Sequence, residues 1–138
     1  MGTPANSEQG KNPGRQDMDE KKKTIIIYSP DLNFCFSLSM VFQDRYNVIT
    51  TTNLGMLEKF VAIYSADLVI VDAVPSDKLI DRIDALKGPA GTLPVIVLYV
   101  YSGRDVALDR AIRSHVDSVF YKPFEISAIS KRIDELLA

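Results

Sequence analysis

The chain has 138 residues, of which 46% are hydrophobic and 25% are charged, and this length favours one domain with its own core. Sixteen basic and eighteen acidic residues leave a net charge of -2, which argues against a broad nucleic-acid-binding surface. No apolar run approaches the roughly 18 residues that a membrane-spanning helix needs, so we expect no membrane contact.

The cysteine content and the N-terminal segment favour a cytoplasmic protein. Cys35 is the only cysteine, which excludes an internal disulfide and a cysteine-based metal cluster. The N-terminus lacks the charged-then-apolar pattern of a signal peptide. Residues 1–23 are rich in Gly, Pro, Gln and charge and lack aromatic or β-branched apolar anchors. We therefore expect a disordered tail at 1–23 and one domain at 24–138.

From residue 24 onward, short apolar runs alternate with amphipathic segments of helical length. The expected strands are 24–28, 47–51, 67–72, 94–99 and 118–121. The expected helices are 32–44, 54–64, 78–87, 105–114 and 126–137. Repeated strand-helix units with right-handed crossovers predict an α/β fold with a doubly wound five-stranded parallel sheet. Its chemistry should lie beyond the carboxyl ends of the strands.

Two charged residues occupy such strand ends. Asp72 closes the run DLVIVD, whose continuous apolar character is typical of a central strand buried on both faces. Lys122 follows the last strand, and Pro123 favours an extended backbone at this lysine. We expect the ammonium of Lys122 to point across the strand ends toward Asp72.

The helix expected at 32–44 has apolar residues on more than one side. A helical period places Phe34, Leu38, Val41 and Phe42 on the core face and leaves Phe36 and Met40 nearly opposite. Phe36 and Met40 are either ordinary exposed residues or part of an interface, such as that of a homodimer.

The segments DLVIVDAVP at 67–75, LPVIVLY at 93–99 and VFYKPF at 119–124 resemble the response-regulator receiver domain, which is CheY-like and flavodoxin-like in fold. The resemblance covers essentially all of 24–138. It implies the strand order 2-1-3-4-5 and a role in two-component phosphorelay signalling, with a histidine kinase or an output protein as partner. It also implies that Asp72 accepts the phosphoryl group and that Lys122 contacts it.

The metal-binding positions of that family are altered in this chain. The acidic pair after the first strand aligns with Ser29 and Pro30, and neither supplies the carboxylate that Mg²⁺ prefers. Asp31 could replace the pair if the loop were shifted by one residue. The chain would then offer at best two metal ligands, Asp72 and Asp31. We expect an atypical receiver with impaired Mg²⁺-dependent phosphorylation.

The switch positions of the family are altered as well. Tyr99 stands where the family carries a sensing Thr or Ser, and its hydroxyl lies far out on a rigid ring. Ser102 is a weak substitute. Val119 stands where a switch aromatic is expected. His115, the only histidine, stands where the family has a small residue, and we assign it no metal or catalytic role.

The missing acids motivate a specific hypothesis for the strand ends. Without neighbouring carboxylates, Asp72 and Lys122 are expected to form a standing salt bridge in a domain that acts by protein contact and has no enzyme activity. One alternative is a working phosphoacceptor with an altered metal site. A weaker alternative is an FMN-binding protein, which the loop Ser29-Pro30-Asp31 disfavours because it lacks one N–H donor and adds a negative charge.

Overall fold

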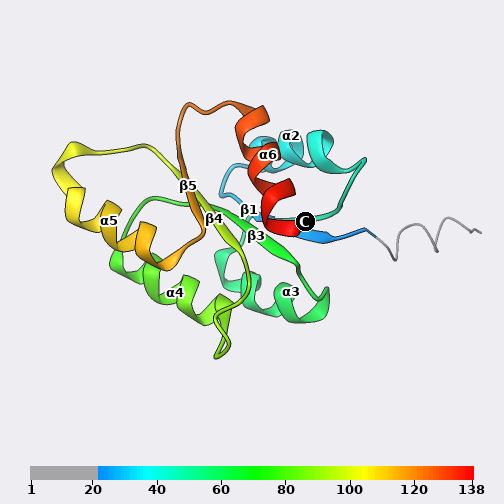
Figure 1. Cartoon of the computed structure of the whole chain (residues 1–138), viewed down its shortest axis with the longest axis horizontal. Coiled ribbons are helices and arrows are strands. Elements are labelled where there is room, and N and C mark those ends of the chain that lie inside the picture. The colour runs from blue at the N-terminus through cyan, green and yellow to red at the C-terminus, as the bar shows by residue number, and fades with distance from the viewer. Residues whose placement is uncertain (1–21) are drawn as a thin grey trace, which may run out of the picture.

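Five parallel strands form one sheet in the order β2-β1-β3-β4-β5 (Figure 1), as the sequence predicted. This computed structural model describes residues 22–138, so nearly all of the tail expected at 1–23 lies outside the described residues. The strands are β1 (Thr24–Tyr28), β2 (Asn47–Thr51), β3 (Leu68–Asp72), β4 (Val95–Tyr99) and β5 (Ser118–Tyr121).

Five α-helices follow the strands in turn. They are α2 (Leu32–Phe42), α3 (Leu57–Ile63), α4 (Asp77–Lys87), α5 (Val106–His115) and α6 (Ile126–Leu137). Short 3-10 turns, η1 (Leu54–Met56) and η2 (Gly103–Asp105), precede α3 and α5. Within residues 22–138, no helix has both the length and the apolar character to cross a membrane.

Helices cover both faces of the sheet (Figure 1). Helices α2 and α6 pack on one face over Ile25, Ile27 and Ile70, while α3, α4 and α5 pack on the other over Ile26 and Val69. Because successive strand residues point to opposite faces, the apolar run of each central strand supplies both cores. All five residues of β3 are buried, as expected for a central strand.

The inward face of α2 differs from the predicted one at Val41. This residue was expected in the core but is 49% exposed, whereas Cys35 is buried with Leu38 and Phe42. The thiol of Cys35 lies 3.6 Å from the carbonyl oxygen of Ser29, so the small side chain lets α2 approach the β1 end closely. The exposure expected for Phe36 and Met40 is confirmed at 66% and 53%.

A second difference lies at the end of α3. Tyr64, the last residue of the helix expected at 54–64, lies outside the observed helix and is 45% exposed, because the helix ends at Ile63 and Tyr64 is its C-cap. Its ring packs edge-on against Phe60 at the helix surface, with ring centroids 5.7 Å apart.

Candidate functional site

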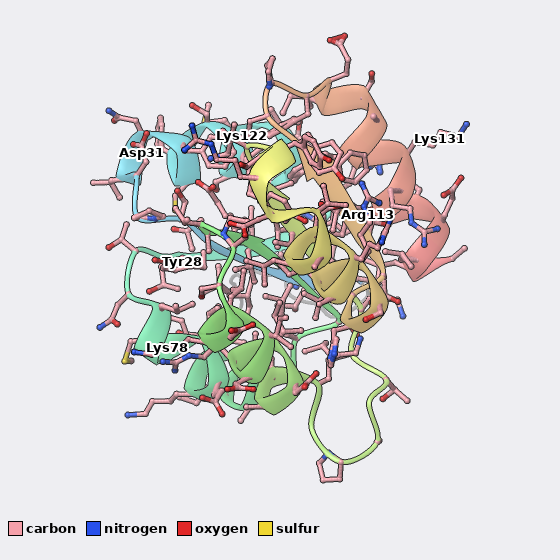
Figure 2. All side chains as sticks on the ribbon, turned by 90° about the vertical axis from the view of Figure 1, so that its left-hand side faces the viewer. Tyr28, Asp31, Lys78, Arg113, Lys122 and Lys131 are labelled. Atoms are coloured by element: carbon pink, nitrogen blue, oxygen red, sulfur yellow. The ribbon has the colours of Figure 1, made fainter. Side chains whose placement is uncertain are left out.

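The candidate site is built around Asp72 at the carboxyl end of β3. The residue is only 6% exposed, and both of its carboxylate oxygens have partners. The ammonium of Lys122 forms an ion pair with Oδ1, and the hydroxyl of Ser29 donates a hydrogen bond of 2.7 Å to Oδ2. The salt bridge expected from the sequence is therefore present. Figure 2 views this end of the sheet, with Lys122 labelled.

Lys122 is held by more than the carboxylate. Its backbone N–H donates to the carbonyl oxygen of Tyr99 over 2.9 Å, and Nζ lies 5.2 Å from the centre of the Phe34 ring. The ring of Phe34 in turn packs edge-on against Phe124, with centroids 6.0 Å apart. A cation over an aromatic face gains electrostatic stabilisation beyond that of the ion pair. Helix α2 thus helps to fix the lysine beside Asp72.

Ser29 links Asp72 to the start of α2. The serine is fully buried, and its hydroxyl oxygen accepts a 3.0 Å hydrogen bond from the backbone N–H of Asp31. Its own N–H donates to the carbonyl oxygen of Thr51 on β2 over 3.2 Å. A position that the family resemblance fills with an acid therefore holds a neutral hydroxyl with partners on both sides.

Asp31 caps the start of helix α2 at the surface. One of its carboxylate oxygens accepts hydrogen bonds from the N–H groups of Asn33 (2.9 Å) and Phe34 (3.3 Å), which makes Asp31 the N-cap of α2. Pro30 beside it is exposed and carries no charge. The loop does not turn Asp31 toward Asp72, and the direct contact to Asp72 comes from Ser29.

The side chains around Asp72 do not fit Mg²⁺. This hard cation is bound by several oxygen ligands, commonly including more than one carboxylate, and retains waters in an octahedral arrangement. Among residues 22–138, no group of three or more His, Cys, Asp or Glu side chains could hold a metal ion. The Asp72 carboxylate already has a cation and a hydroxyl donor in contact with it.

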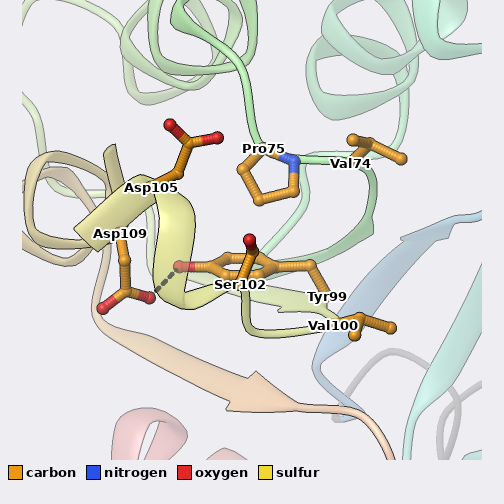
Figure 3. Close-up of a pocket in the computed structure, with 7 residues that line it drawn as sticks. All are labelled: Val74, Pro75, Tyr99, Val100, Ser102, Asp105 and Asp109. Atoms are coloured by element: carbon orange, nitrogen blue, oxygen red, sulfur yellow. Dashed lines mark hydrogen bonds between the residues drawn. The ribbon is translucent and has the colours of Figure 1, made fainter. Parts of the chain in front are cut away.

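Tyr99 points away from Asp72 and toward α5. It is 3% exposed, and its hydroxyl donates a 2.6 Å hydrogen bond to Oδ1 of Asp109 (Figure 3). Burial, together with the hydrogen bond to Asp109, raises the pKa of the Tyr99 hydroxyl well above its usual range. The Tyr99 hydroxyl, at the position of the family's sensing residue, is therefore a neutral group that donates its hydrogen bond to Asp109 on α5.

Two further residues complete this network, and sequence reasoning missed both of them as well as Asp109. The hydroxyl of Tyr121 lies 2.8 and 2.9 Å from the two oxygens of Asp109. Arg113 Nε lies 3.3 Å from Asp109 Oδ2 and 3.1 Å from the Tyr121 hydroxyl oxygen. The guanidinium of Arg113 also lies 4.9 Å from the centre of the Tyr121 ring. We call Tyr99, Asp109, Arg113 and Tyr121 the Asp109 network.

The charge of Asp109 is well compensated. Burial alone would raise the pKa of this carboxyl, but the hydrogen bonds from Tyr99 and Tyr121 and the charge of Arg113 outweigh it and hold the pKa below its usual value.

Val119, the residue at the expected switch-aromatic position, is half-buried against the core that α3, α4 and α5 cover. Tyr121 lies on the same face of β5 two residues later, because side chains of a strand alternate between faces.

A hollow of about 150 Å³ opens between the β3–α4 and β4–α5 loops (Figure 3). Val74, Pro75, Tyr99 and Val100 line it, and Ser102, Asp105 and Asp109 contribute its polar groups. A neighbouring hollow shares the four apolar residues and reaches Asp72 and Lys122. The strand ends thus carry an apolar depression with the Asp72–Lys122 ion pair at one end and the acids Asp105 and Asp109 at the other.

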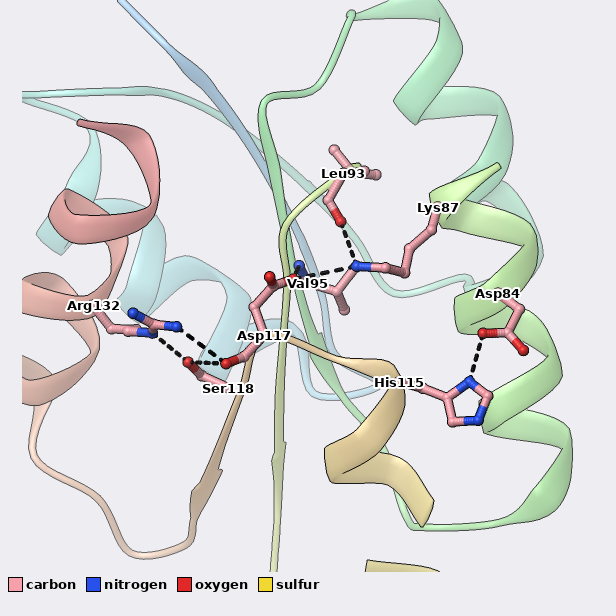
Figure 4. A network of polar contacts seen from close by, with 8 residues as sticks. All are labelled: Asp84, Lys87, Leu93, Val95, His115, Asp117, Ser118 and Arg132. Carbon is pink, nitrogen blue, oxygen red and sulfur yellow. Dashed lines mark hydrogen bonds and ion pairs between the residues drawn. The ribbon is translucent and has the colours of Figure 1, made fainter. Parts of the chain in front are cut away.

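A separate group of polar contacts lies away from Asp72 and ties elements together at the other end of the sheet (Figure 4). Asp117 Oδ2 accepts a 2.8 Å hydrogen bond from the N–H of Val95 and lies 3.3 Å from the ammonium of Lys87. His115 Nδ1 lies 2.8 Å from Asp84 Oδ1, which joins α5 to α4 at the surface. These contacts join β4 and α5 to α4, and among residues 22–138 no group of three or more His, Cys, Asp or Glu side chains that could hold a metal ion includes His115.

No protein-family model matches the chain, and no curated protein matches it significantly. Many solved structures share its fold. A receiver domain of a histidine kinase from Syntrophus aciditrophicus matches 83% of this chain and 89% of its own, with 22% identity and a TM-score of 0.71. A response regulator from Bermanella marisrubri is 21% identical over 86% of this chain and 100% of its own, with a TM-score of 0.71.

A third match is a pilus assembly-related protein from Burkholderia pseudomallei. It is 20% identical over 83% of this chain and 89% of its own, with a TM-score of 0.68. The chain therefore has the CheY-like receiver fold predicted from its strand-end motifs.

Proposed function

We propose that this chain is an atypical receiver-like domain of two-component signalling, located in the cytoplasm, that acts by binding a kinase or output protein. It has no enzyme activity, and Mg²⁺-dependent phosphorylation of Asp72 is impaired. The observation that carries the proposal is the occupation of both Asp72 oxygens, one by Lys122 and the other by Ser29.

Phosphoryl transfer to a carboxylate needs a free nucleophilic oxygen and a cation that screens the incoming phosphoryl oxygens. At Asp72 one oxygen is paired with Lys122 and the other accepts a hydrogen bond. The neighbouring loop offers Ser29 and Pro30 rather than carboxylates, which leaves Mg²⁺ without its usual ligands. The Lys122 contact resembles the lysine contact that the family makes to the phosphoryl group, so it supports a domain held in one state.

The Asp109 network also supports a domain held in one state, at the surface that would bind a partner. Family resemblance places partner contacts on the face formed by α5, β5 and α6. In this chain a hydroxyl from β4, a hydroxyl from β5 and a guanidinium from α5 converge on one carboxylate at that face. Three donors on one largely buried carboxylate favour one arrangement of α5 against the sheet.

The test is phosphorylation by acetyl phosphate in the presence of Mg²⁺, followed by the mass of the intact protein. We expect no phosphoryl adduct on the wild-type chain. The variant Ser29→Asp/Pro30→Asp, which restores the acidic pair, is expected to gain Mg²⁺ binding and an adduct. An adduct on the wild type that disappears in Asp72→Asn would show a working phosphoacceptor and overturn the proposal.

A further inference from the structure

The hollow in Figure 3 combines apolar walls with an acidic end. Pro75 and Val74 form one wall and Val100 lies across from them, with the ring of Tyr99 between. The rim is apolar as well, since Val74 is 85% exposed and Val100 66% exposed. Exposed apolar side chains around a hollow are typical of sites that bind another molecule.

At the acidic end, one carboxylate has no side-chain partner among residues 22–138. Asp105 stands at the N-cap position of α5, but its side chain makes no capping hydrogen bond. Across residues 22–138 it also forms no ion pair, and Figure 3 shows its carboxylate beside the hollow near Pro75. Asp109, in contrast, is fully engaged by Tyr99, Tyr121 and Arg113. An apolar hollow with a free carboxylate at one end is complementary to a cation on an apolar stem.

The other end of the depression sets the orientation of such a cation. The neighbouring hollow shares Val74, Pro75, Tyr99 and Val100 but ends at Asp72 and Lys122, which are already paired with each other, so this end offers no free carboxylate to a second cation. The bound cation must therefore point toward Asp105. A guanidinium suits this carboxylate better than an ammonium, because it is weakly hydrated, presents paired N–H donors and stacks on aromatic rings.

We propose that this hollow binds an arginine side chain of a partner protein, with the aliphatic stem between Val74, Pro75 and Val100 and the guanidinium on Asp105. The inference rests on the proposed function, because it names the partner chemistry for a domain that acts by contact. The exposed side chains of Val74 and Val100, at 85% and 66%, provide the apolar surface that would flank the arginine. The partner segment should therefore carry apolar residues next to its arginine.

The experiment uses the full chain labelled with ¹⁵N and two small probes. N-acetyl-arginine methylamide is titrated against the protein, and the amide shifts of Val74, Val100, Ser102 and Asp105 are followed. N-acetyl-citrulline methylamide has the same shape without the charge. We expect saturable shifts at these four residues with the arginine probe and at least threefold weaker binding of the citrulline probe.

Two variants locate the interaction. Asp105→Asn keeps the shape of the side chain and should weaken the arginine probe about three- to tenfold. Asp81→Asn on the exposed side of α4 should leave the binding unchanged. Equal binding of both probes, equal binding to wild type and Asp105→Asn, or shifts centred on α4 would overturn the proposal. Phosphorylation of Asp72 with arginine binding intact would overturn only the proposed function.

Discussion

Lys122 supplies the positive charge that offsets the buried carboxylate of Asp72. Its side chain is 33% exposed, whereas that of Asp72 is 8% exposed, so the two partners do not lose water equally. Removing the lysine leaves a buried, negatively charged group with one hydroxyl donor. Removing the charge from both residues leaves no such group, so the two changes should not be additive.

We therefore expect Lys122→Met to lower the free energy of unfolding by about 2 kcal/mol, because it leaves the Asp72 charge unpaired. The double variant Asp72→Asn/Lys122→Met should recover most of this loss. Urea denaturation of the wild type, both single variants and the double variant gives the coupling. Lys131→Met on α6 serves as the control. Additive losses in the double variant would mean that the ion pair contributes nothing to stability.

Tyr99 is the residue whose change most directly tests the Asp109 network. Its hydroxyl is one of two tyrosine donors to Asp109, and it lies in the interior. Tyr99→Phe removes that donor but keeps the ring. We expect a loss of about 1–3 kcal/mol in the free energy of unfolding, measured by urea denaturation, because a buried charged acceptor loses a partner.

The matched control is Tyr101→Phe. Tyr101 is 44% exposed, and its ring contacts Tyr121 with centroids 5.0 Å apart. Because its hydroxyl makes no contact with Asp109, this variant should unfold like the wild type. A loss of stability in Tyr101→Phe equal to that in Tyr99→Phe would count against a specific role for the network.

At the scale of an element, α2 is unusual because none of its eleven residues is charged. Leu32, Phe36 and Met40 follow one another at intervals of four and are 68%, 66% and 53% exposed, so they form a stripe on the outer face. Two copies of this stripe can meet without charge repulsion. A two-fold axis perpendicular to the helix would place the two helices antiparallel, with opposite dipole ends adjacent.

We expect the wild-type chain to form a weak dimer through this stripe. Phe36→Ser/Met40→Ser should raise the dimer dissociation constant at least tenfold, because each lost apolar contact contributes on the order of 1.5–3 kcal/mol when fully buried. Sedimentation velocity over a concentration series measures this change. Ile63→Ser/Tyr64→Ser at the end of α3 removes a comparable exposed apolar pair and is the control. A wild-type chain that stays monomeric at high concentration would contradict the prediction.

The elements were predictable where local signals agree. The bounds of β1, β2, β5 and α6 match the expected ranges, because each apolar run or stripe is closed by residues that stop it, such as Pro30 after β1. The helix starts expected at 54 and 105 are 3-10 turns instead. Asn53 and Ser102 cap these turns with side-chain hydrogen bonds, and Gly55 lowers helical preference in the first of them.

The Asp72–Lys122 contact was predictable because parallel strands bring their carboxyl ends together. The Asp109 network was not, because Asp109 looks like an ordinary acid on an amphipathic helix. The burial of Asp109 depends on how α5 packs over β4 and β5, and no local sequence pattern indicates this packing. The period of two along β5 could have placed Tyr121 on the face of Val119, but its partner on α5 had no sequence signal.

At the scale of the whole molecule, polar contacts tie both ends of the sheet. At the amino end, Asp117 connects β4 and α4, and Arg132 of α6 donates to the Ser118 hydroxyl over 2.5 Å. At the carboxyl end, the Asp72 ion pair and the Asp109 network connect strands to loops and helices. Contacts that span separate elements at both ends favour a domain with one stable arrangement, which agrees with binding by a fixed surface.

The pH dependence of stability should report this arrangement. Burial and the contacts with Asp109 raise the pKa of Tyr99, and burial likewise raises the pKa of Tyr121. The stability that these two raised pKa values contribute is fully present below the unfolded tyrosine pKa of about 10. It is lost as pH rises through the pKa values of the folded state. The lowered pKa of Asp109 acts oppositely, so its contribution is present above about pH 3.9 and is lost as pH falls through the folded value.

We therefore expect the free energy of unfolding to be highest between these limits and to fall from about pH 9 to about pH 11 more steeply in the wild type than in Tyr99→Phe. The variant lacks one hydroxyl that the unfolded chain would ionise, so it has less stability to lose. Urea denaturation at a series of pH values measures both slopes, and Tyr101→Phe should follow the wild type. Equal slopes in the wild type and Tyr99→Phe would show that the Tyr99–Asp109 bond is not coupled to folding.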